Sequence, residues 1–409
     1  MSHTSLMGLS LTAVAALTAT LVATTADGAP AAPATKRDDV PVGASTVALR
    51  ITGHGYGHGH GLSQYGAKGA AAQGLGWEQI VGFYYPGTQV DKARGPVRVL
   101  LTAATKRGVS VEAQDRLRLD RVGGEKSYRL DRLRPGATRW KLMPRGSRSV
   151  LSYQARSGGW KRLTSFPGTG EFSGGNRPVT LRLPGGATAD YRGALRLVDG
   201  TTVNVLPLER YLRGVVAREV PATWPAAAVQ SQAVAARTYA AYERADASGS
   251  YDLCDTTACQ VYGGVAAEHP DTNAAIRATR NRVVTYAGAP AFTQFSSSNG
   301  GHSAAGSMPY LVAQPDPYEA SSANPYATWT TTLARSEVEE QWPQVGQLTR
   351  LTLTRDAQGN RVATVLLSGS GGSVTVAGDG FRSALGLRSE WFAVSTASRN
   401  RVTRAGSLR

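Results

Sequence analysis

A glycine-rich stretch near the N-terminus contains three of the six histidines of the chain. The stretch GHGYGHGHGLSQYGAKGAAAQG occupies residues 53–74 and includes His54, His58 and His60. A phosphate-binding loop is disfavoured, because the Lys-Ser/Thr pair of such loops is missing. The imidazoles could bind a metal, but no Asp, Glu or Cys stands among them to complete a ligand set. Glycines that accept positive φ and close backbone contacts favour instead the wall of a groove, with His58 as a hydrogen-bonding or packing residue.

Glu219 is a second candidate for chemistry. The apolar residues 215–217 are separated from it by Arg218 alone, and Val220-Pro221 follow it directly. A carboxyl group held against apolar neighbours at a chain bend has a raised pKa. A general acid for glycosidic cleavage requires such a pKa. The same pattern also fits an ordinary surface glutamate, and composition and spacing alone do not decide between the two.

One further residue group suggests chemistry that the sequence does not support. Ser296, Ser297 and Ser298 lie near His302, but the chain has no G-x-S-x-G elbow, which disfavours a serine hydrolase. No cofactor-binding motif was found, and no cofactor is expected.

The cysteines Cys254 and Cys259 are the two cysteines of the chain, in the segment CDTTAC. Zinc would need four ligands, and the nearest histidine, His269, lies ten residues beyond Cys259. In an exported protein a disulfide is the default state of such a pair. We therefore expect a disulfide and no metal site.

The elements that would position these residues change character along the chain. Residues 97–206 alternate apolar and polar residues in short runs separated by Gly, Pro and Asp, which predicts an antiparallel sheet. Residues 208–217 then follow a helical period. Pro221 excludes Val220 from helical geometry, so Glu219 is expected at or just past the helix end. A second helix should begin near Pro225, and a third should cover residues 273–280.

The N-terminal segment and the charge predict where the protein acts. Residues 6–26 are apolar and small, and a small-residue zone around positions 26–34 follows, which favours a secretory signal peptide over a membrane anchor. The formal net charge is +16 and the isoelectric point is about 10.1. Such charge fits nucleic acid, an anionic cell-wall polymer or a solvated basic surface. For an exported protein we expect no nucleic acid and no stable membrane insertion after signal cleavage.

The segment LERYLRGVVAREVPATWPAAAVQSQAVAARTYA, residues 208–240, resembles the core of the SpoIID/LytB family of cell-wall proteins. The family pattern is met except at Arg210, Val220 and Ser231. Similar pieces are CDTTACQVYGG, FSSSNGGHS, FRSALGLRSEWF and the Gly-His stretch, in which His60 and Leu62 depart from the pattern. In many members the Gly-His motif comes last, whereas here it comes first. We therefore expect residues 53–86 to pack against a body formed by residues 200–395.

The resemblance implies a secreted, cell-wall-associated lytic transglycosylase that cuts peptidoglycan glycan strands after N-acetylmuramic acid and leaves 1,6-anhydro ends. Glu219 would act first as acid and then as base. Substrate-binding roles would fall to Gln232, Arg237, Ser297, Ser298, Gly300, Gly301, His58, Gln64 and Tyr65, although a structural salt bridge is an equal alternative for Arg237. Other autolysins such as amidases are possible partners. The alternative function is a non-catalytic wall-binding or amidase-enhancing protein.

The expected fold is α+β, with an antiparallel β-rich body, a few packed helices that carry the active-site groove, and a β-rich subdomain. The expected division is a signal peptide at 1–29, a linker at 30–45, the Gly-His segment at 46–90, the β-rich subdomain at 91–190, a SpoIID/LytB-like catalytic domain at 191–396, and a basic tail at 397–409.

Overall fold

The computed structural model describes residues 36–104, 108–124 and 126–398. The predicted signal peptide and most of the predicted basic tail lie outside these residues. The described chain combines helices with mostly antiparallel sheets, so the predicted α+β class is confirmed. Within the same residues, no helix combines the length and the apolar character needed to cross a membrane.

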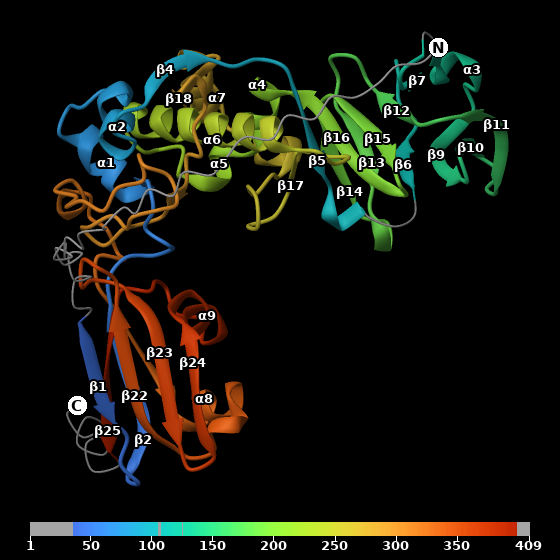
Figure 1. Ribbon diagram of the computed structural model, residues 1–409. Coiled ribbons are helices and arrows are strands. Elements are labelled where there is room, and N and C mark those ends of the chain that lie inside the picture. Colours follow the sequence, from blue (N-terminus) through green and yellow to red (C-terminus); the bar gives the residue numbers. More distant parts are fainter. Residues whose placement is uncertain (1–35, 105–107, 125, 399–409) are drawn as a thin grey trace, which may run out of the picture.

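A long central helix organises the upper body of the molecule (Figure 1). This helix, α6 (Ala226–Asp246), begins directly after Pro225, as the sequence predicts. Its many alanines let other backbones approach closely, and it contacts α1, α2, α7 and β18. The surrounding elements are α1 (Gln64–Ala72), α2 (Trp77–Tyr84), α7 (Pro270–Ala278), β4 (Gln89–Lys92), β18 (Arg282–Tyr286) and β19 (Ala289–Pro290). Apolar side chains of α1, α2 and β18, including Ala67, Ile80 and Val284, share one core with Val234 of α6.

A β-rich arm extends from one end of this body (Figure 1). One sheet has the strand order β17-β5-β16-β15-β12-β7-β8 and the other has the order β11-β10-β9-β6-β13-β14. The first comprises β5 (Pro96–Leu100), β7 (Arg118–Arg121), β8 (Ser127–Arg129), β12 (Gly170–Ser173), β15 (Ala194–Val198), β16 (Thr201–Pro207) and β17 (Leu253–Cys254). The second comprises β6 (Val109–Glu112), β9 (Ala137–Arg145), β10 (Arg148–Ala155), β11 (Trp160–Pro167), β13 (Val179–Arg182) and β14 (Thr188–Tyr191). Two short helical turns, η1 (Thr102–Ala104) and α3 (Leu130–Leu133), connect the sheets, and η2 (Pro184–Gly186) joins β13 to β14.

The core of the arm extends to α6, where it forms a cluster distinct from the one that contains Val234. Trp140 and Phe172 of the arm belong to the same buried cluster as Val229 and Ala233 of α6. Strand β16 also runs directly into the helical segment that starts at Leu208. The region predicted as a subdomain at 91–190 therefore shares its hydrophobic core with the residues that follow it.

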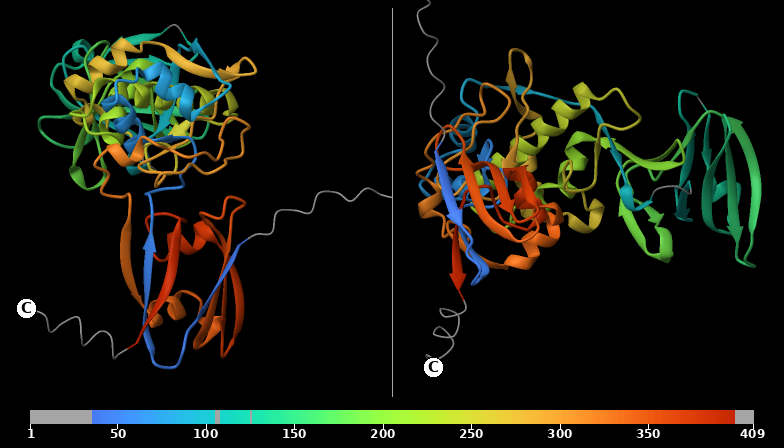
Figure 2. Two further views of the ribbon diagram at one scale, coloured as in Figure 1. Left: turned by 90° about the vertical axis from the view of Figure 1, so that its left-hand side faces the viewer. Right: turned by 60° about the horizontal axis from the view of Figure 1, so that its bottom comes forward.

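A separate β lobe lies below the body and is built from both ends of the described chain (Figure 2). Its sheets have the orders β1-β22-β23-β24 and β21-β2-β25. They comprise β1 (Arg37–Pro41), β2 (Thr46–Gly53), β21 (Trp329–Ala334), β22 (Leu348–Arg355), β23 (Val362–Gly369), β24 (Gly372–Ala377) and β25 (Phe392–Ser398), with α8 (Arg335–Gln341), η6 (Pro343–Val345) and α9 (Gly378–Ala384). Leu49, Ile51, Leu351 and Phe381 lie in its own core.

Part of the predicted linker and tail is regular structure. Residues 37–41 form strand β1, which pairs antiparallel with β22. Asp38 also forms an ion pair with Arg355, with 2.6 Å between Asp38 Oδ2 and Arg355 Nη2. The linker prediction is wrong for these residues, because a strand edge far along the chain supplies the backbone partners that the local sequence does not reveal. The predicted tail likewise begins inside β25.

The Gly-His segment leaves the lower lobe at the end of β2 and packs against the upper body (Figure 2). Its short strand β3 (Leu62–Ser63) pairs in parallel with β20 (Phe295–Ser296). A further bridge joins Tyr56 to Ser298. The segment therefore contributes one wall of the structure around the Ser/Gly loop at residues 296–303.

Candidate active site

Glu219 lies at the end of an interrupted helix. The sequence predicts one helix over 208–217, but the structure has α4 (Leu208–Tyr211), η3 (Leu212–Gly214) and α5 (Val216–Glu219). At Gly214, an added Cβ would come within 2.5 Å of the Tyr262 ring, so this close approach requires glycine. Val220 is extended, with φ −135° and ψ 147°, as expected before proline. The helix therefore ends at Glu219, at the predicted position.

The Glu219 side chain borders a cavity of about 700 Å³. Segments that are distant in sequence build the wall around it. The lining residues are Tyr56, Gly57, His58, Gln64, Glu219, Tyr239, residues 257–261, Phe292, residues 294–297 and Arg382. Among these described residues Glu219 supplies the single carboxyl group.

The environment of Glu219 favours its protonated form. Burial raises the pKa of the Glu219 carboxyl to about 7. Hydrogen bonds from the Gln64 side chain and the Val261 backbone act in the opposite direction but do not cancel the burial. At neutral pH both the acid and the carboxylate are therefore populated, which suits a group that must donate and then accept a proton.

His58 forms part of the cavity wall and is held neutral. Its Nδ1 accepts a hydrogen bond from the His60 backbone N–H at 3.0 Å, and the two imidazole rings stack with centroids 5.0 Å apart. Burial, assisted by His60, Arg361 and Arg382, lowers the pKa of His58 to about 3. A neutral imidazole that accepts a hydrogen bond and stacks on a second ring is compatible with the hydrogen-bonding or packing residue expected from the sequence.

The glycines around His58 are required by backbone geometry. Gly57 has φ +104°, and a Cβ there would come within 2.7 Å of the Ser296 side chain. Gly61 has φ +63°, and a Cβ there would come within 2.2 Å of the Gln294 carbonyl oxygen. Side chains at either position would push the Gly-His segment away from the strand that carries residues 294–297.

The other two histidines of the stretch are turned to different partners. The His54 ring lies against Trp391 at 4.9 Å and its Nδ1 is 3.0 Å from the Ala327 carbonyl oxygen. His60 Nδ1 is 3.3 Å from the Ala304 carbonyl oxygen. In the described residues no group of three or more His, Cys, Asp or Glu side chains is placed to hold a metal ion.

Gln64 is the first residue of α1, and Ser63 caps that helix by accepting from the Gly66 backbone N–H. The Gln64 amide also donates to Gln232 Oε1 at 3.4 Å. Gln232 is buried, does not line the cavity, and its Nε2 has no partner among the described residues. The structure therefore places Gln64 at the cavity and Gln232 behind it, so that Gln232 can orient Gln64 rather than touch a substrate.

With this geometry described, the comparisons with known proteins become informative. The SpoIID family profile, described as "Stage II sporulation protein", matches residues 198–286 and so includes Glu219 and the disulfide pair. The SpoIID domain of this chain is the matched part, residues 198–286. This confirms the resemblance to the SpoIID/LytB family seen in the sequence.

Three curated relatives match parts of this chain. The "Amidase enhancer" of Bacillus subtilis (strain 168) is 37% identical over 134 residues, which cover 31% of this chain and 17% of the relative. The "Stage II sporulation protein D" of the same organism is 28% identical over 215 residues, 46% of this chain and 62% of the relative. An uncharacterised protein of Brachyspira hyodysenteriae is 34% identical over 132 residues, 31% of this chain and 36% of the relative. The chain thus matches less than two thirds of the length of each of these relatives.

The disulfide of the SpoIID domain borders the cavity. Cys254 and Cys259 are bonded, which confirms the prediction from the sequence. Cys259 lines the cavity together with Thr257, Ala258, Gln260 and Val261. The cross-link therefore closes a short loop that ends two residues before Val261, whose backbone hydrogen-bonds to Glu219.

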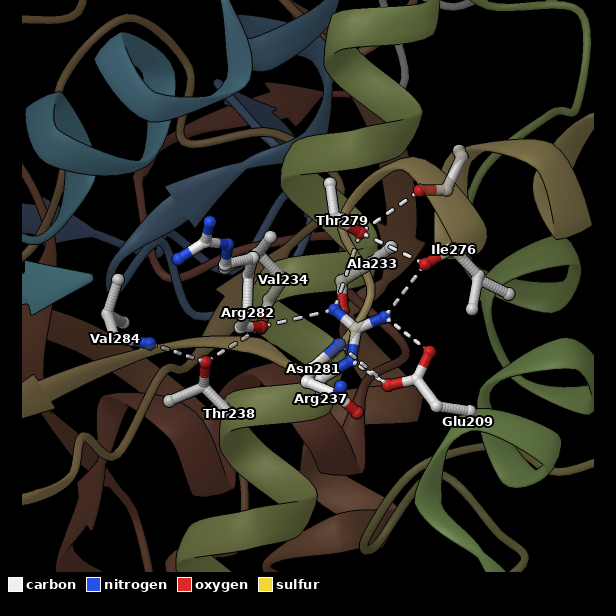
Figure 3. Close-up of polar contacts among 11 residues, drawn as sticks. Glu209, Ala233, Val234, Arg237, Thr238, Ile276, Thr279, Asn281, Arg282 and Val284 are labelled. Carbon is white, nitrogen blue, oxygen red and sulfur yellow. Dashed lines mark hydrogen bonds and ion pairs between the residues drawn. The ribbon is translucent and has the colours of Figure 1, made fainter. Parts of the chain in front are cut away.

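Arg237 of the SpoIID domain is structural (Figure 3). It is fully buried and does not line the cavity. Its Nε and Nη2 donate to the two oxygens of Glu209 at 2.7 and 3.1 Å, and its remaining N–H groups donate to carbonyl oxygens that include those of Ile276 and Arg282. The substrate-binding assignment of Arg237 is therefore corrected, and the salt-bridge alternative is the one observed.

The Ser/Gly loop reaches the cavity at one end only. Ser296 and Ser297 line it. Ser298 is buried and donates to Glu319 Oε2 at 2.9 Å, while Gly300 packs against the backbone of Gly55. Ser298, Gly300 and Gly301 therefore support the loop and do not line the cavity, because the chain turns back toward the Gly-His segment after Ser297.

Tyr65 lies beside the cavity in a row of aromatic side chains. Tyr56 is exposed and lines the cavity, and its ring is 5.0 Å from Tyr326. Tyr326 is 5.7 Å from Tyr65, and Tyr65 is 5.0 Å from Trp224. Lys68 Nζ is 5.5 Å from the Tyr65 and Trp224 rings. We call Tyr56, Tyr326, Tyr65 and Trp224 the aromatic row.

Several cavity residues escaped the sequence analysis. Tyr239 follows Arg237 on α6, and Phe292, Gln294 and Phe295 precede the Ser/Gly loop. Arg382 lies in the closing segment FRSALGLRSEWF. Each stands in or beside a segment that resembles the family, so proximity to those segments was the signal that could have identified them.

Proposed function

We propose that this protein is a secreted peptidoglycan lytic transglycosylase in which Glu219 performs both proton transfers. The observation that carries the proposal is a single carboxyl group, half-buried at the end of α5, that faces a cavity of about 700 Å³. Enzymes that hydrolyse glycosidic bonds with two carboxyl groups would need a second acid across the cavity. A transglycosylase needs only one.

In the first step the protonated Glu219 donates its proton to the glycosidic oxygen that follows N-acetylmuramic acid. The bond between C1 and that oxygen breaks, and the leaving sugar departs with a free hydroxyl group. The sugar ring retains an oxocarbenium-like charge at C1. Because burial raises the pKa of Glu219 to about 7, the proton is available near neutral pH.

In the second step the Glu219 carboxylate accepts the proton of the C6 hydroxyl of the same sugar. The C6 oxygen then attacks C1 and forms the 1,6-anhydro bond, which regenerates the acid. No water enters the reaction, and proton count and charge balance over the two steps. The Gln64 amide and the Val261 backbone would steady the carboxylate between the steps through the hydrogen bonds that they make to it.

The surroundings of the cavity suit a glycan strand. The aromatic row begins at Tyr56 in the cavity and continues to Trp224. Sugar rings have apolar faces that pack against aromatic side chains whose polar ends stay in water. Ser296, Ser297 and the neutral His58 add hydrogen-bonding groups at the cavity wall. Tyr65 would then bind the strand outside the cavity.

The test is digestion of purified glycan strands, with and without stem peptides, by the wild-type protein and by Glu219→Gln. We expect 1,6-anhydromuramic ends from the wild type and a loss of at least about 1,000-fold in rate for Glu219→Gln, detected by mass spectrometry. Glu340→Gln is the matched control, because Glu340 is an exposed glutamate in α8 of the lower lobe. The rate should fall as pH rises through about 7, as Glu219 loses its proton.

The relative named "Amidase enhancer" favours a second candidate, a non-catalytic wall protein that stimulates an amidase. Digestion separates the candidates. Reducing ends in place of anhydro ends would contradict the transglycosylase. A folded wild-type protein that binds wall, cleaves nothing and accelerates a cell-wall amidase would establish the second candidate.

A further inference from the structure

Five arginines surround a second cavity of about 690 Å³ on the SpoIID domain. Arg210 and Arg213 come from the interrupted helix, Arg277 and Arg280 come from the end of α7 and just beyond it, and Arg94 precedes β5. This cavity shares no lining residue with the cavity at Glu219. We call it the arginine cavity.

These arginines are not neutralised by acids of the described chain. The guanidinium groups of four of them make no hydrogen bond or ion pair within the described residues, namely those of Arg94, Arg213, Arg277 and Arg280. The Arg210 guanidinium donates to the neutral side chain of Asn176 at 3.1 Å. The cavity thus concentrates positive charge that has no internal counterion.

The one acid of the arginine cavity is already committed (Figure 3). Both oxygens of Glu209 accept from the buried Arg237, and Oε1 also accepts from the Asn281 backbone N–H at 3.1 Å. Glu209 and Arg237 therefore cancel each other, and the five lining arginines keep their full excess charge.

A nearby cavity shows that arginines alone do not make such a site. That cavity of about 320 Å³ is lined by Arg116, Arg118, Arg129 and Arg177. Each of these has an acid within reach, namely Asp115 for Arg116 and Arg177, Asp120 for Arg118, and Asp131 for Arg129. Among the described residues, the arginines of the smaller cavity are therefore paired with acids, whereas those that line the arginine cavity are not.

The chemistry of the arginine cavity matches phosphate. A guanidinium group donates two parallel hydrogen bonds to an oxyanion. A carboxylate has only two oxygens and is satisfied by one or two arginines, as Glu209 is by Arg237. A phosphate group offers more acceptor oxygens, and a chain of phosphates carries a charge at every repeat, so several arginines can be used at once.

We propose that the arginine cavity binds the phosphate groups of a flexible anionic polymer of the poly(polyol phosphate) type. A concave site between helix ends admits single phosphate groups of a flexible chain more readily than the stiff backbone of a nucleic-acid duplex. Because the two cavities share no residue, this site stands whether or not Glu219 cleaves glycans. Its occupation would hold the SpoIID domain on a phosphate-bearing surface.

The test compares two triple variants that lose the same formal charge. Arg213→Gln/Arg277→Gln/Arg280→Gln alters the arginine cavity, and Arg116→Gln/Arg118→Gln/Arg177→Gln alters the neutralised cavity. Titration calorimetry at fixed salt measures the binding of a glycerol phosphate oligomer, inorganic phosphate and a DNA duplex with equal phosphate content. We expect the first variant to bind the oligomer at least about tenfold more weakly, and the second to stay within about threefold of wild type.

The other outcomes are also decisive. The wild-type protein could bind inorganic phosphate but not the oligomer, while the first variant binds neither. That result would overturn the polymer as the ligand and assign the site to a small phosphate compound. Equal weakening in the two variants would attribute binding to diffuse surface charge and overturn the proposal. The proposal would also be overturned if the arginine cavity bound the DNA duplex more tightly than the oligomer. It would equally be overturned if the wild-type protein bound none of the three probes. Circular dichroism confirms that both variants are folded.

Discussion

At the scale of single residues, the surroundings of Glu219 determine its chemistry. A glutamate in water has a pKa near 4.3 and is ionised at neutral pH. Here burial raises the pKa to about 7, although two hydrogen bonds favour the carboxylate. Ionisation of Glu219 above that pH therefore works against folding.

This gives a stability prediction for Glu219→Gln. The folded pKa of Glu219 lies above the unfolded value, so its contribution to stability is complete below about pH 4 and is lost as pH rises through about 7. Glutamine does not titrate. Relative to wild type, Glu219→Gln should therefore gain about 1–3 kcal/mol of unfolding free energy between pH 4 and pH 8.

Urea unfolding of both proteins at the two pH values measures this gain. The control Glu340→Gln replaces an exposed glutamate and should differ from wild type by the same amount at pH 4 and pH 8. A difference between Glu219→Gln and wild type that does not change with pH would show that Glu219 is not held protonated in the folded protein.

At the scale of elements, one buried arginine ties the interrupted helix to the central helix. Arg237 on α6 is paired with Glu209 on α4 and donates to carbonyl oxygens at the end of α7 and the start of β18. Its side chain is fully buried and that of Glu209 is 23% exposed. Because a buried charge without its partner is costly, these elements depend on the pair remaining complete.

Arg237→Met should therefore destabilise the protein by about 3–5 kcal/mol, because it leaves Glu209 partly buried without its counterion. The double variant Arg237→Met/Glu209→Gln should lose less than the sum of the two single variants. Chemical unfolding of wild type, both single variants and the double variant measures this coupling. Additive losses would contradict it. Since Arg237 does not line the cavity, the folded fraction of each variant should bind glycan as wild type does.

At the scale of the whole molecule, the lower lobe supports the Gly-His segment. Strand β2 lies between β21 and β25, so the residues that lead into the segment pair on both sides with the last part of the described chain. The Ser389 hydroxyl also donates to the His54 carbonyl oxygen at 2.5 Å. The C-terminal strands thus help to hold an N-terminal segment against the cavity.

Truncation after Thr328 should release the Gly-His segment. It removes both neighbours of β2, so amide hydrogens of residues 46–60 should exchange at least roughly 100-fold faster, while the centre of α6 keeps its protection. Hydrogen exchange followed by mass spectrometry measures this. Truncation after Ser398 is the control and should leave exchange unchanged. Unaltered protection of residues 54–60 in the shorter chain would show that the upper body alone holds the segment.

The sequence by itself determined the local features. Pro221 ends α5 at Glu219, Pro225 precedes α6, and the alternating runs of residues 97–206 form strands, because proline geometry and side-chain periodicity act over a few residues. The cysteine pair is also local, and its disulfide was predicted. The family resemblance directed attention to Glu219 and His58 for the same reason, since it rests on short contiguous motifs.

Only the tertiary structure decided which of these residues meet. Gln64 reaches Glu219 across more than a hundred intervening residues, and strand pairing of residues 37–41 depends on β22. Among the predicted substrate-binding residues, His58, Gln64 and Ser297 line the cavity, whereas Gln232, Arg237 and Ser298 are buried behind it. Burial, and with it the pKa of Glu219, is set by surfaces brought together from the whole chain. A local pattern carries no information about those surfaces, and this is why the sequence could single out Glu219 as a candidate but could not show how deeply it is buried.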